Sequence, residues 1–323
     1  MVDYSDILTA RDRLAGHALR TPLLSAPQLD AIAGRRVLVK AECLQRTGSF
    51  KFRGAWNRIS ALTPAERVGG VVASSSGNHA QGVALSCQTL NIPATIVMPA
   101  DAPAAKIDAT RDYGAEVIFY DRHSEDRDAL SEVLAAERGA VLVRPFDDPF
   151  VIAGQGTCGL EIAEQARAQG VEGGTVLVCC GGGGLSSGVA LALEREAPAM
   201  TVRPVEPEGF DDMARSLVAG ARVANVPGVT SIQDAILTAM PGTLTFPVAQ
   251  RLFGPGLVTT DAQAMRAMAL AWQWLKIVLE PGGAAALAAA LFQGAALEDG
   301  PVIVTASGGN VDASVFTRAL ASA

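Results

Sequence analysis

The segment TVLVCCGGGGLSSGVALALERE, residues 175–196, decides the fold. An apolar run (175–180) passes through four glycines into an amphipathic stretch (185–196), which predicts a strand, a tight loop and a helix. The same order recurs along the chain, and such alternation is typical of parallel sheets with helices on both faces. The other expected strands are 37–41, 71–74, 94–98, 116–120, 141–145, 201–206 and 301–305, and the other expected helices are 52–62, 78–90, 126–137, 153–168, 262–278 and 283–293.

Two interruptions divide this pattern, ALTPAERVGG (61–70) and RPFDDPF (144–150), where Pro, Gly and Asp gather. They predict a large domain, residues 1–66 and 148–323, with a small domain, residues 67–147, inserted into it. We therefore expect an α/β protein with two open, twisted, mostly parallel sheets. In such sheets ligands bind beyond the carboxyl ends of the strands, so the loops there should carry the chemistry.

Composition excludes several classes of protein. The 323 residues are 49% hydrophobic with a formal net charge of −7, and no basic stripe indicates a nucleic-acid partner. No uncharged apolar run reaches the roughly 18 residues of a membrane span, and the charged N-terminus MVDYSDILTARDRL is unlike a secretory signal, so we expect a cytoplasmic protein. Five cysteines without CxxC spacing indicate reduced thiols, and only three histidines are present, which argues against a Cys/His metal cluster.

Lys51 lies between Phe50 and Phe52 in TGSFKFRG (47–54), where a strand gives way to a helix. Apolar neighbours favour the neutral amine and lower the pKa of a lysine, which makes it a nucleophile or a base. The alternative is an exposed lysine at the start of a helix.

The loop SSSGNHAQG (74–82) opens another expected helix. Backbone N–H groups at such a helix start bind anions, and four side chains add donors there. An N-cap in a tight turn is the alternative. The four residues are Ser75, Ser76, Asn78 and His79.

Glycines 181–184 leave their amides uncovered and able to surround a phosphate at a helix start. The run matches neither GxGxxG nor GxxxxGK[ST], so a single phosphate group is favoured over a dinucleotide or triphosphate. A flexible loop is the alternative.

The motif SGGN (307–310) follows the last expected strand. It adds the Ser307 hydroxyl group at a point where two glycines permit the close approach of a ring.

Together these loops resemble the fold type II pyridoxal-phosphate enzymes, which share the fold of the tryptophan synthase β chain, and in particular their serine/threonine dehydratase and serine racemase branch, which includes 3-hydroxyaspartate dehydratases. The resemblance runs from RTPLL (20–24) to SGGNVD (307–312). SFKFRGA (49–55) is similar to the Schiff-base lysine motif, SSGNHAQG (75–82) to the substrate-carboxylate loop, GGGGLSSG (181–188) to the phosphate loop, and SGGN (307–310) to the ring-nitrogen site.

The resemblance implies pyridoxal 5'-phosphate as cofactor and a role for each matching residue. Lys51 would form the Schiff base, Phe50 would pack on the ring, and Asn78 would hold the 3-hydroxyl group. Ser307 would face the ring nitrogen, where a neutral partner makes the ring a weaker electron sink and favours elimination over transamination. The phosphate would be held by Gly181, Gly182, Gly183, Gly184 and Leu185, and the substrate carboxylate by Ser75, Ser76, Asn78 and His79.

The implied reaction is loss of water from a β-hydroxy-L-amino acid of the threonine or serine type, which gives a 2-oxo acid and ammonia, with Lys51 as the base. SIQDAI (231–236) and EPGGAAALAA (280–289) depart from the family pattern, so 3-hydroxyaspartate is an alternative substrate. Ser76 occupies the position that serves a racemase, so racemisation is a second alternative. A phosphate-ligand protein without catalysis is a third.

The resemblance also implies a divalent cation, such as Mg²⁺ or Ca²⁺, and a homodimer. The ligands would be the carboxylates of Glu206 and Asp212 and the carbonyl of Phe210, in EPEGFDDM (206–213). The alternative is that these acidic side chains favour a helix N-terminus.

Overall fold

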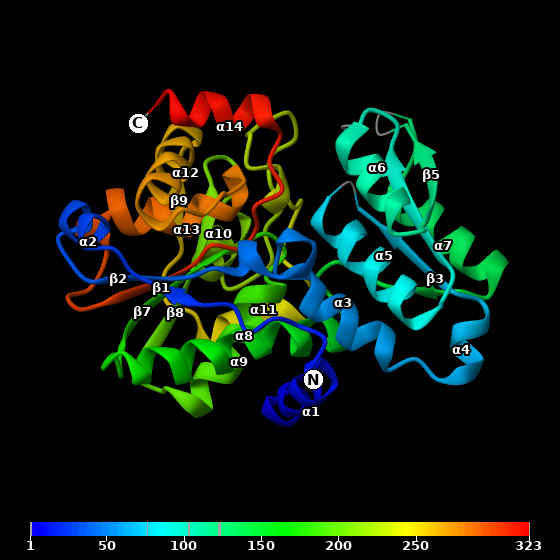
Figure 1. Cartoon of the computed structure of the whole chain (residues 1–323), viewed down its shortest axis with the longest axis horizontal. Coiled ribbons are helices and arrows are strands. Elements are labelled where there is room, and N and C mark those ends of the chain that lie inside the picture. The colour runs from blue at the N-terminus through cyan, green and yellow to red at the C-terminus, as the bar shows by residue number, and fades with distance from the viewer. Residues whose placement is uncertain (1, 76, 103, 122–123, 323) are drawn as a thin grey trace.

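Two sheets in two lobes make up the computed structural model, which describes residues 2–75, 77–102, 104–121 and 124–322 (Figure 1). The larger sheet has the strand order β1-β2-β10-β7-β8-β9, in which β1 is antiparallel to β2 and the other neighbours are parallel. Its strands are β1 (Leu23–Leu24), β2 (Val37–Lys40), β7 (Gly174–Cys179), β8 (Met200–Pro207), β9 (Leu257–Thr259) and β10 (Val302–Thr305).

The smaller sheet is wholly parallel, with the strand order β5-β4-β3-β6. Its strands are β3 (Val71–Ser74), β4 (Ala94–Pro99), β5 (Glu116–Tyr120) and β6 (Val141–Leu142). The helices are α1 (Tyr4–Leu14), α2 (Pro27–Ala33), α3 (Lys51–Ser60), α4 (Pro64–Val68), α5 (Asn78–Leu90), α6 (Ala104–Asp112), α7 (Arg127–Arg138), α8 (Pro149–Ala168), α9 (Gly184–Glu196), α10 (Asp212–Ala219), α11 (Thr245–Leu252), α12 (Asp261–Leu275), α13 (Pro281–Phe292) and α14 (Ala313–Leu320), with short 3₁₀ turns η1 (Glu42–Leu44), η2 (Arg46–Gly48), η3 (Asp234–Ile236) and η4 (Gly294–Ala296).

Alternate residues of the strands face opposite helical layers. On β2, Val37 and Val39 pack against the layer of α2, α12, α13 and α14, while Leu38 packs against α8 and α9. The alanines of α13 are fully buried, and their small side chains let this helix lie close to the sheet. Both faces of the larger sheet are therefore covered, as parallel sheets require.

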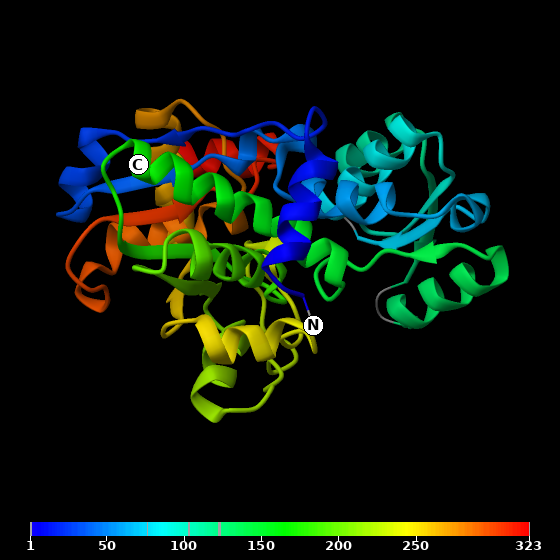
Figure 2. The ribbon, with the colours of Figure 1, turned by 90° about the horizontal axis from the view of Figure 1, so that it is seen from below.

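Helix α3 connects the two lobes (Figures 1 and 2). It shares a core with α5 and β3 of the smaller lobe and also packs against α8 of the larger lobe. Under its first turn, the buried Arg53 guanidinium pairs with the carboxylates of Glu42 and Glu161 at 2.7 Å each. This network fixes the start of α3, and Lys51 is its first residue.

The expected α/β architecture and all eight expected strands are confirmed, with differences at several ends. β6 stops at Leu142 rather than 145. The Val143 N–H still donates to the Val72 carbonyl at 2.9 Å, but Pro145 has no N–H with which to continue the ladder. Helix α8 starts at Pro149, earlier than expected, because Asp148 caps it by accepting from the Val151 N–H. Helix α12 ends at Leu275 because Lys276 adopts a left-handed conformation, with φ +59°.

All five cysteines are unpaired and buried. Within the ranges that the structure describes, no helix is both long enough and apolar enough to cross a membrane.

Candidate active site

Lys51 lies where the loops after β2 and β10 meet. The Phe50 N–H donates to the Ser307 carbonyl at 3.1 Å, and Ser49 forms an isolated bridge with Gly308. Two segments that are more than 250 residues apart in sequence therefore act as one support for the lysine. Ser307 itself is buried at the end of β10.

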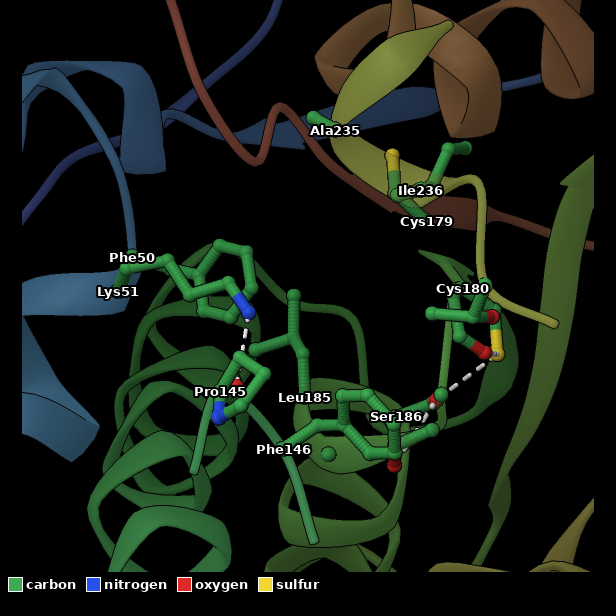
Figure 3. A pocket seen from close by; sticks show the side chains of 15 residues that line it. Phe50, Lys51, Pro145, Phe146, Cys179, Cys180, Leu185, Ser186, Ala235 and Ile236 are labelled. Carbon is green, nitrogen blue, oxygen red and sulfur yellow. Dashed lines mark hydrogen bonds between the residues drawn. The ribbon is translucent and has the colours of Figure 1, made fainter. Parts of the chain in front are cut away.

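The Lys51 amine points into a cavity beside the glycine loop (Figure 3). Its Nζ donates to the Pro145 carbonyl at 2.8 Å and lies 5.2 Å from the centre of the Phe50 ring. Burial lowers the pKa of Lys51 to about 8, although the Glu280 carboxylate acts in the opposite direction. A much larger fraction of this amine than of an ordinary lysine is therefore neutral and nucleophilic near neutral pH.

The glycine loop (181–184) connects β7 to the first turn of α9 and lines the same cavity, together with Phe50 and Leu185. A Cβ on Gly182 would lie 2.3 Å from the Phe146 ring, and Gly183 has φ +92°. These positions therefore require glycine. Uncovered amides at the start of a 13-residue helix suit a phosphate, so this part of the site fits pyridoxal phosphate.

A second cavity of about 500 Å³ adjoins the first and contains the predicted carboxylate loop. Ser75, Asn78 and His79 line it at the carboxyl end of β3 and the first turn of α5, while Ser76 lies outside the described residues. Lys51 lines both cavities, so the amine stands between the glycine loop and the α5 N-terminus.

His79 differs from the expectation that its side chain donates to an anion. Burial lowers its pKa to about 3, and the positive charge of Lys51 adds to this effect. The neutral ring contacts the Val143 carbonyl through Nε2 at 3.0 Å, which assigns the proton to that nitrogen and leaves Nδ1 as an acceptor. The backbone N–H of His79, in the first turn of α5, is the donor that remains for an anion.

Glu280 is a site residue that the sequence analysis did not single out. Its buried carboxylate accepts from Asn78 Nδ2 at 2.5 Å, and Asn310 donates to Asn78 Oδ1 at 2.7 Å. Burial raises the pKa of Glu280 to about 7, with the nearby Asp234 adding to the effect. The two contacts fix the orientation of the Asn78 amide. The stretch 280–289 was expected to border the site because of Gly282 and Gly283, and not because of the Glu280 carboxylate.

Lys106 and Asp234 were also missed, and they line the second cavity from opposite lobes. Lys106 Nζ lies 2.7 Å from Asp234 Oδ2. The two residues lie 128 positions apart in sequence. Asp234 belongs to SIQDAI (231–236), one of the two stretches that depart from the family pattern, whereas no motif indicated Lys106.

The residues expected to bind a cation lie together after β8, but much of their bonding capacity is used. Both oxygens of Glu206 accept backbone N–H groups, from Met213 and Ala214, at 2.8 Å each. Asp212 Oδ1 accepts from Asn225 Nδ2 at 2.6 Å, whereas its buried Oδ2 has no partner among the described residues. Burial raises the pKa of Asp212 to about 6. Glu206 therefore caps the start of α10 whether or not it also binds a cation, and Asp212 Oδ2 is the ligand atom of this set that has no partner among the described residues.

Across the described ranges, no group of three His, Cys, Asp or Glu side chains is arranged to hold a metal ion. The proposed ligand set, with two carboxylates and one carbonyl, is a different arrangement and stays a prediction.

Comparisons of the sequence with a family model and with known proteins indicate the same family of enzymes. Residues 14–308 match the family model described as "Pyridoxal-phosphate dependent enzyme". The chain is 43% identical to an L-threo-3-hydroxyaspartate ammonia-lyase of Pseudomonas sp., over 98% of both chains. It is 40% identical to an L-threonine ammonia-lyase of Thermotoga maritima, over 98% of this chain and 78% of that one.

A solved structure, that of maize serine racemase, superimposes with a TM-score of 0.91 and 38% identity, over 99% of this chain and 97% of that one. The expected branch, fold type and cofactor are thereby confirmed. The chain belongs to the pyridoxal-phosphate dependent enzyme family, as a fold type II member of its ammonia-lyase and serine racemase branch.

Proposed function

We propose that this enzyme removes water from a β-hydroxy-L-amino acid and releases a 2-oxo acid and ammonia in equal amounts. The observation that carries the proposal is the Lys51 amine, whose pKa is lowered to about 8 between a phosphate-type loop and an anion-binding helix start. When bound, pyridoxal phosphate withdraws electrons from the substrate α-carbon, which makes the α-proton removable and allows the β-hydroxyl group to leave.

The cofactor would be held by residues that line the first cavity, together with Asn78, which lines the second cavity, and Ser307, which follows β10. The amides of glycines 181–184 and of Leu185 suit its phosphate, and the neutral Ser307 suits an unprotonated ring nitrogen. Phe50, whose ring is next to the Lys51 amine, supplies an apolar surface. Asn78, fixed by Glu280 and Asn310, would hold the 3-hydroxyl group.

The substrate would enter the second cavity. Its α-carboxylate suits the start of α5, where Ser75, Asn78 and the His79 N–H supply donors. In its neutral form, the Lys51 amine accepts the α-proton and holds it at Nζ. Burial lowers the pKa of that amine to about 8, so it is a weaker base than an ordinary lysine.

Racemisation is the second candidate, because a named serine racemase is among the closely similar structures. It requires a proton donor on the opposite face of the α-carbon, and we assign that role to Ser76. We further propose a homodimer in the cytoplasm, with residues 67–147 as an inserted substrate domain.

A divalent cation bound by Glu206, Asp212 and the Phe210 carbonyl would stabilise α10 away from the chemistry. Asp212→Asn should then remove any response of thermal stability to Mg²⁺ or Ca²⁺. A response that survives this substitution would place the cation elsewhere.

Borohydride reduction tests the assignment of Lys51. Protein purified with pyridoxal phosphate should be yellow, and reduction followed by peptide mapping should find the added mass on the peptide that contains Lys51. Lys51→Ala should lose both the label and ammonia release. A colourless protein that gains no visible absorbance with the cofactor would instead support the phosphate-ligand alternative.

A further inference from the structure

The substrate cavity contains a second cation that the reaction itself does not need. Lys106, on α6 of the smaller lobe, lines this cavity, and only 14% of its side chain is exposed. A Cβ placed on Gly77 would lie 3.9 Å from Lys106 Nζ. The ammonium group is therefore adjacent to the helix start at which the substrate α-carboxylate is proposed to bind.

Lys106 remains charged in this position. Burial favours its neutral form, but the Asp234 carboxylate, with smaller contributions from Glu280 and Asp312, raises its pKa above the ordinary value. The cavity thus presents a positive charge at the start of α5, where a second anionic group on a bound substrate would be attracted.

Asp234, which now pairs with Lys106, can be replaced by an anionic group of the substrate. Asp234 lies on η3 of the larger lobe, and 53% of its side chain is exposed. Its carboxylate therefore returns to water at little cost when another anion takes the ammonium group. A half-exposed ion pair of this kind contributes little to stability.

We infer that Lys106 binds the second carboxylate of a dicarboxylic β-hydroxy amino acid, such as L-threo-3-hydroxyaspartate, in exchange for Asp234. This assignment rests on the proposed function and specifies its substrate class. The two carboxylates of that substrate are separated by two carbons, so one at the α5 start leaves the other within reach of Nζ. Serine and threonine carry no group that replaces Asp234.

Arg127 is the competing cation, because it lines the same cavity. Its side chain is 45% exposed, and its Nε already donates at 3.0 Å to Asp128, the next residue. Lys106 is the more buried of the two and lies beside the carboxylate loop, so it offers the stronger interaction.

The test measures kcat/KM for ammonia release from L-threo-3-hydroxyaspartate and from L-threonine. Lys106→Met should lower the ratio of these two values by about 10- to 100-fold, the effect of removing a charge-assisted hydrogen bond. Arg127→Met and the exposed Lys276→Met serve as controls and should leave the ratio within about threefold.

Asp234→Asn gives a prediction of opposite sign. It removes the internal competitor of the substrate, so the ratio of kcat/KM for the dicarboxylic substrate to kcat/KM for L-threonine should rise. If Lys106 served only to join the lobes, both substitutions would lower both values together.

Equal losses on both substrates with Lys106→Met, or loss of the ratio with Arg127→Met instead, would overturn the assignment. Ammonia release from L-threonine or L-serine but none from L-threo-3-hydroxyaspartate would also overturn the assignment and leave the proposed function standing. Failure of the wild-type enzyme on all three substrates would refute the proposed function itself, and with it this inference.

Discussion

Capture of the cofactor by Lys51 should depend on pH in a way that reports the burial of the amine. Only the neutral amine can attack the aldehyde of pyridoxal phosphate, and burial lowers the pKa of Lys51 to about 8. About 9% of such a group is neutral at pH 7, about half at pH 8 and about 90% at pH 9.

Between pH 7.5 and pH 9.5 the expected curve therefore rises about fourfold and levels off above about pH 9. An ordinary lysine, with a pKa of about 10.4, would rise about 100-fold over the same range without a plateau. The rate is measured by mixing protein freed of cofactor with pyridoxal phosphate between pH 7.5 and 9.5 and following the visible absorbance. Above pH 7.5 the Glu280 carboxyl, with a pKa of about 7, is mostly ionised.

Glu280→Gln provides an internal check. The Glu280 carboxylate raises the pKa of Lys51, so its removal should move the midpoint of the curve to lower pH. A rate that climbs without a plateau to pH 9.5 in the wild-type protein would refute the claim that burial activates this lysine.

Three substitutions test other parts of the site. Gly183→Val should weaken cofactor affinity at least about tenfold in a spectroscopic titration. Gly183 has φ +92°, and a Cβ there would lie 2.8 Å from a methionine methyl group. Gly220→Ala is the control and should leave that affinity unchanged, because Gly220 has φ +68° but nothing near its Cβ. Arg53→Met should lower the free energy of unfolding by about 3–5 kcal/mol in a denaturant titration, because it leaves the buried Glu42 carboxylate without its cation. Arg251 is exposed, so Arg251→Met should lower that free energy by less than about 1 kcal/mol. Ser76→Ala should abolish formation of any D-isomer in a chiral assay and retain ammonia release; full racemisation in this variant would rule out the role assigned to Ser76.

The sequence allowed prediction of those parts of the site in which neighbouring residues act together. One such segment holds Lys51 and its two neighbouring phenylalanines, and another holds the four glycines after β7. Each of these segments follows the end of a strand. In a parallel sheet the carboxyl ends of the strands meet at one edge, so the alternating pattern of strands and helices was enough to bring these segments together.

Residues paired over long distances were not predictable in this way. Asn78 and Glu280 are 202 residues apart, and their contact depends on how the smaller lobe lies against the larger one. The tautomer of His79 likewise depends on the Val143 carbonyl, which belongs to a different strand connection. Periodicity and local composition carry no information about either contact.

The central claim is that Lys51 makes this chain an ammonia-lyase for β-hydroxy amino acids. It is tested most directly by measuring ammonia and 2-oxo acid released from L-serine, L-threonine and L-threo-3-hydroxyaspartate by the enzyme loaded with pyridoxal phosphate. We predict equal amounts of the two products from at least one substrate with the wild-type enzyme, and none with Lys51→Ala. Absence of both products from all three substrates, or their undiminished release by Lys51→Ala, would contradict the claim.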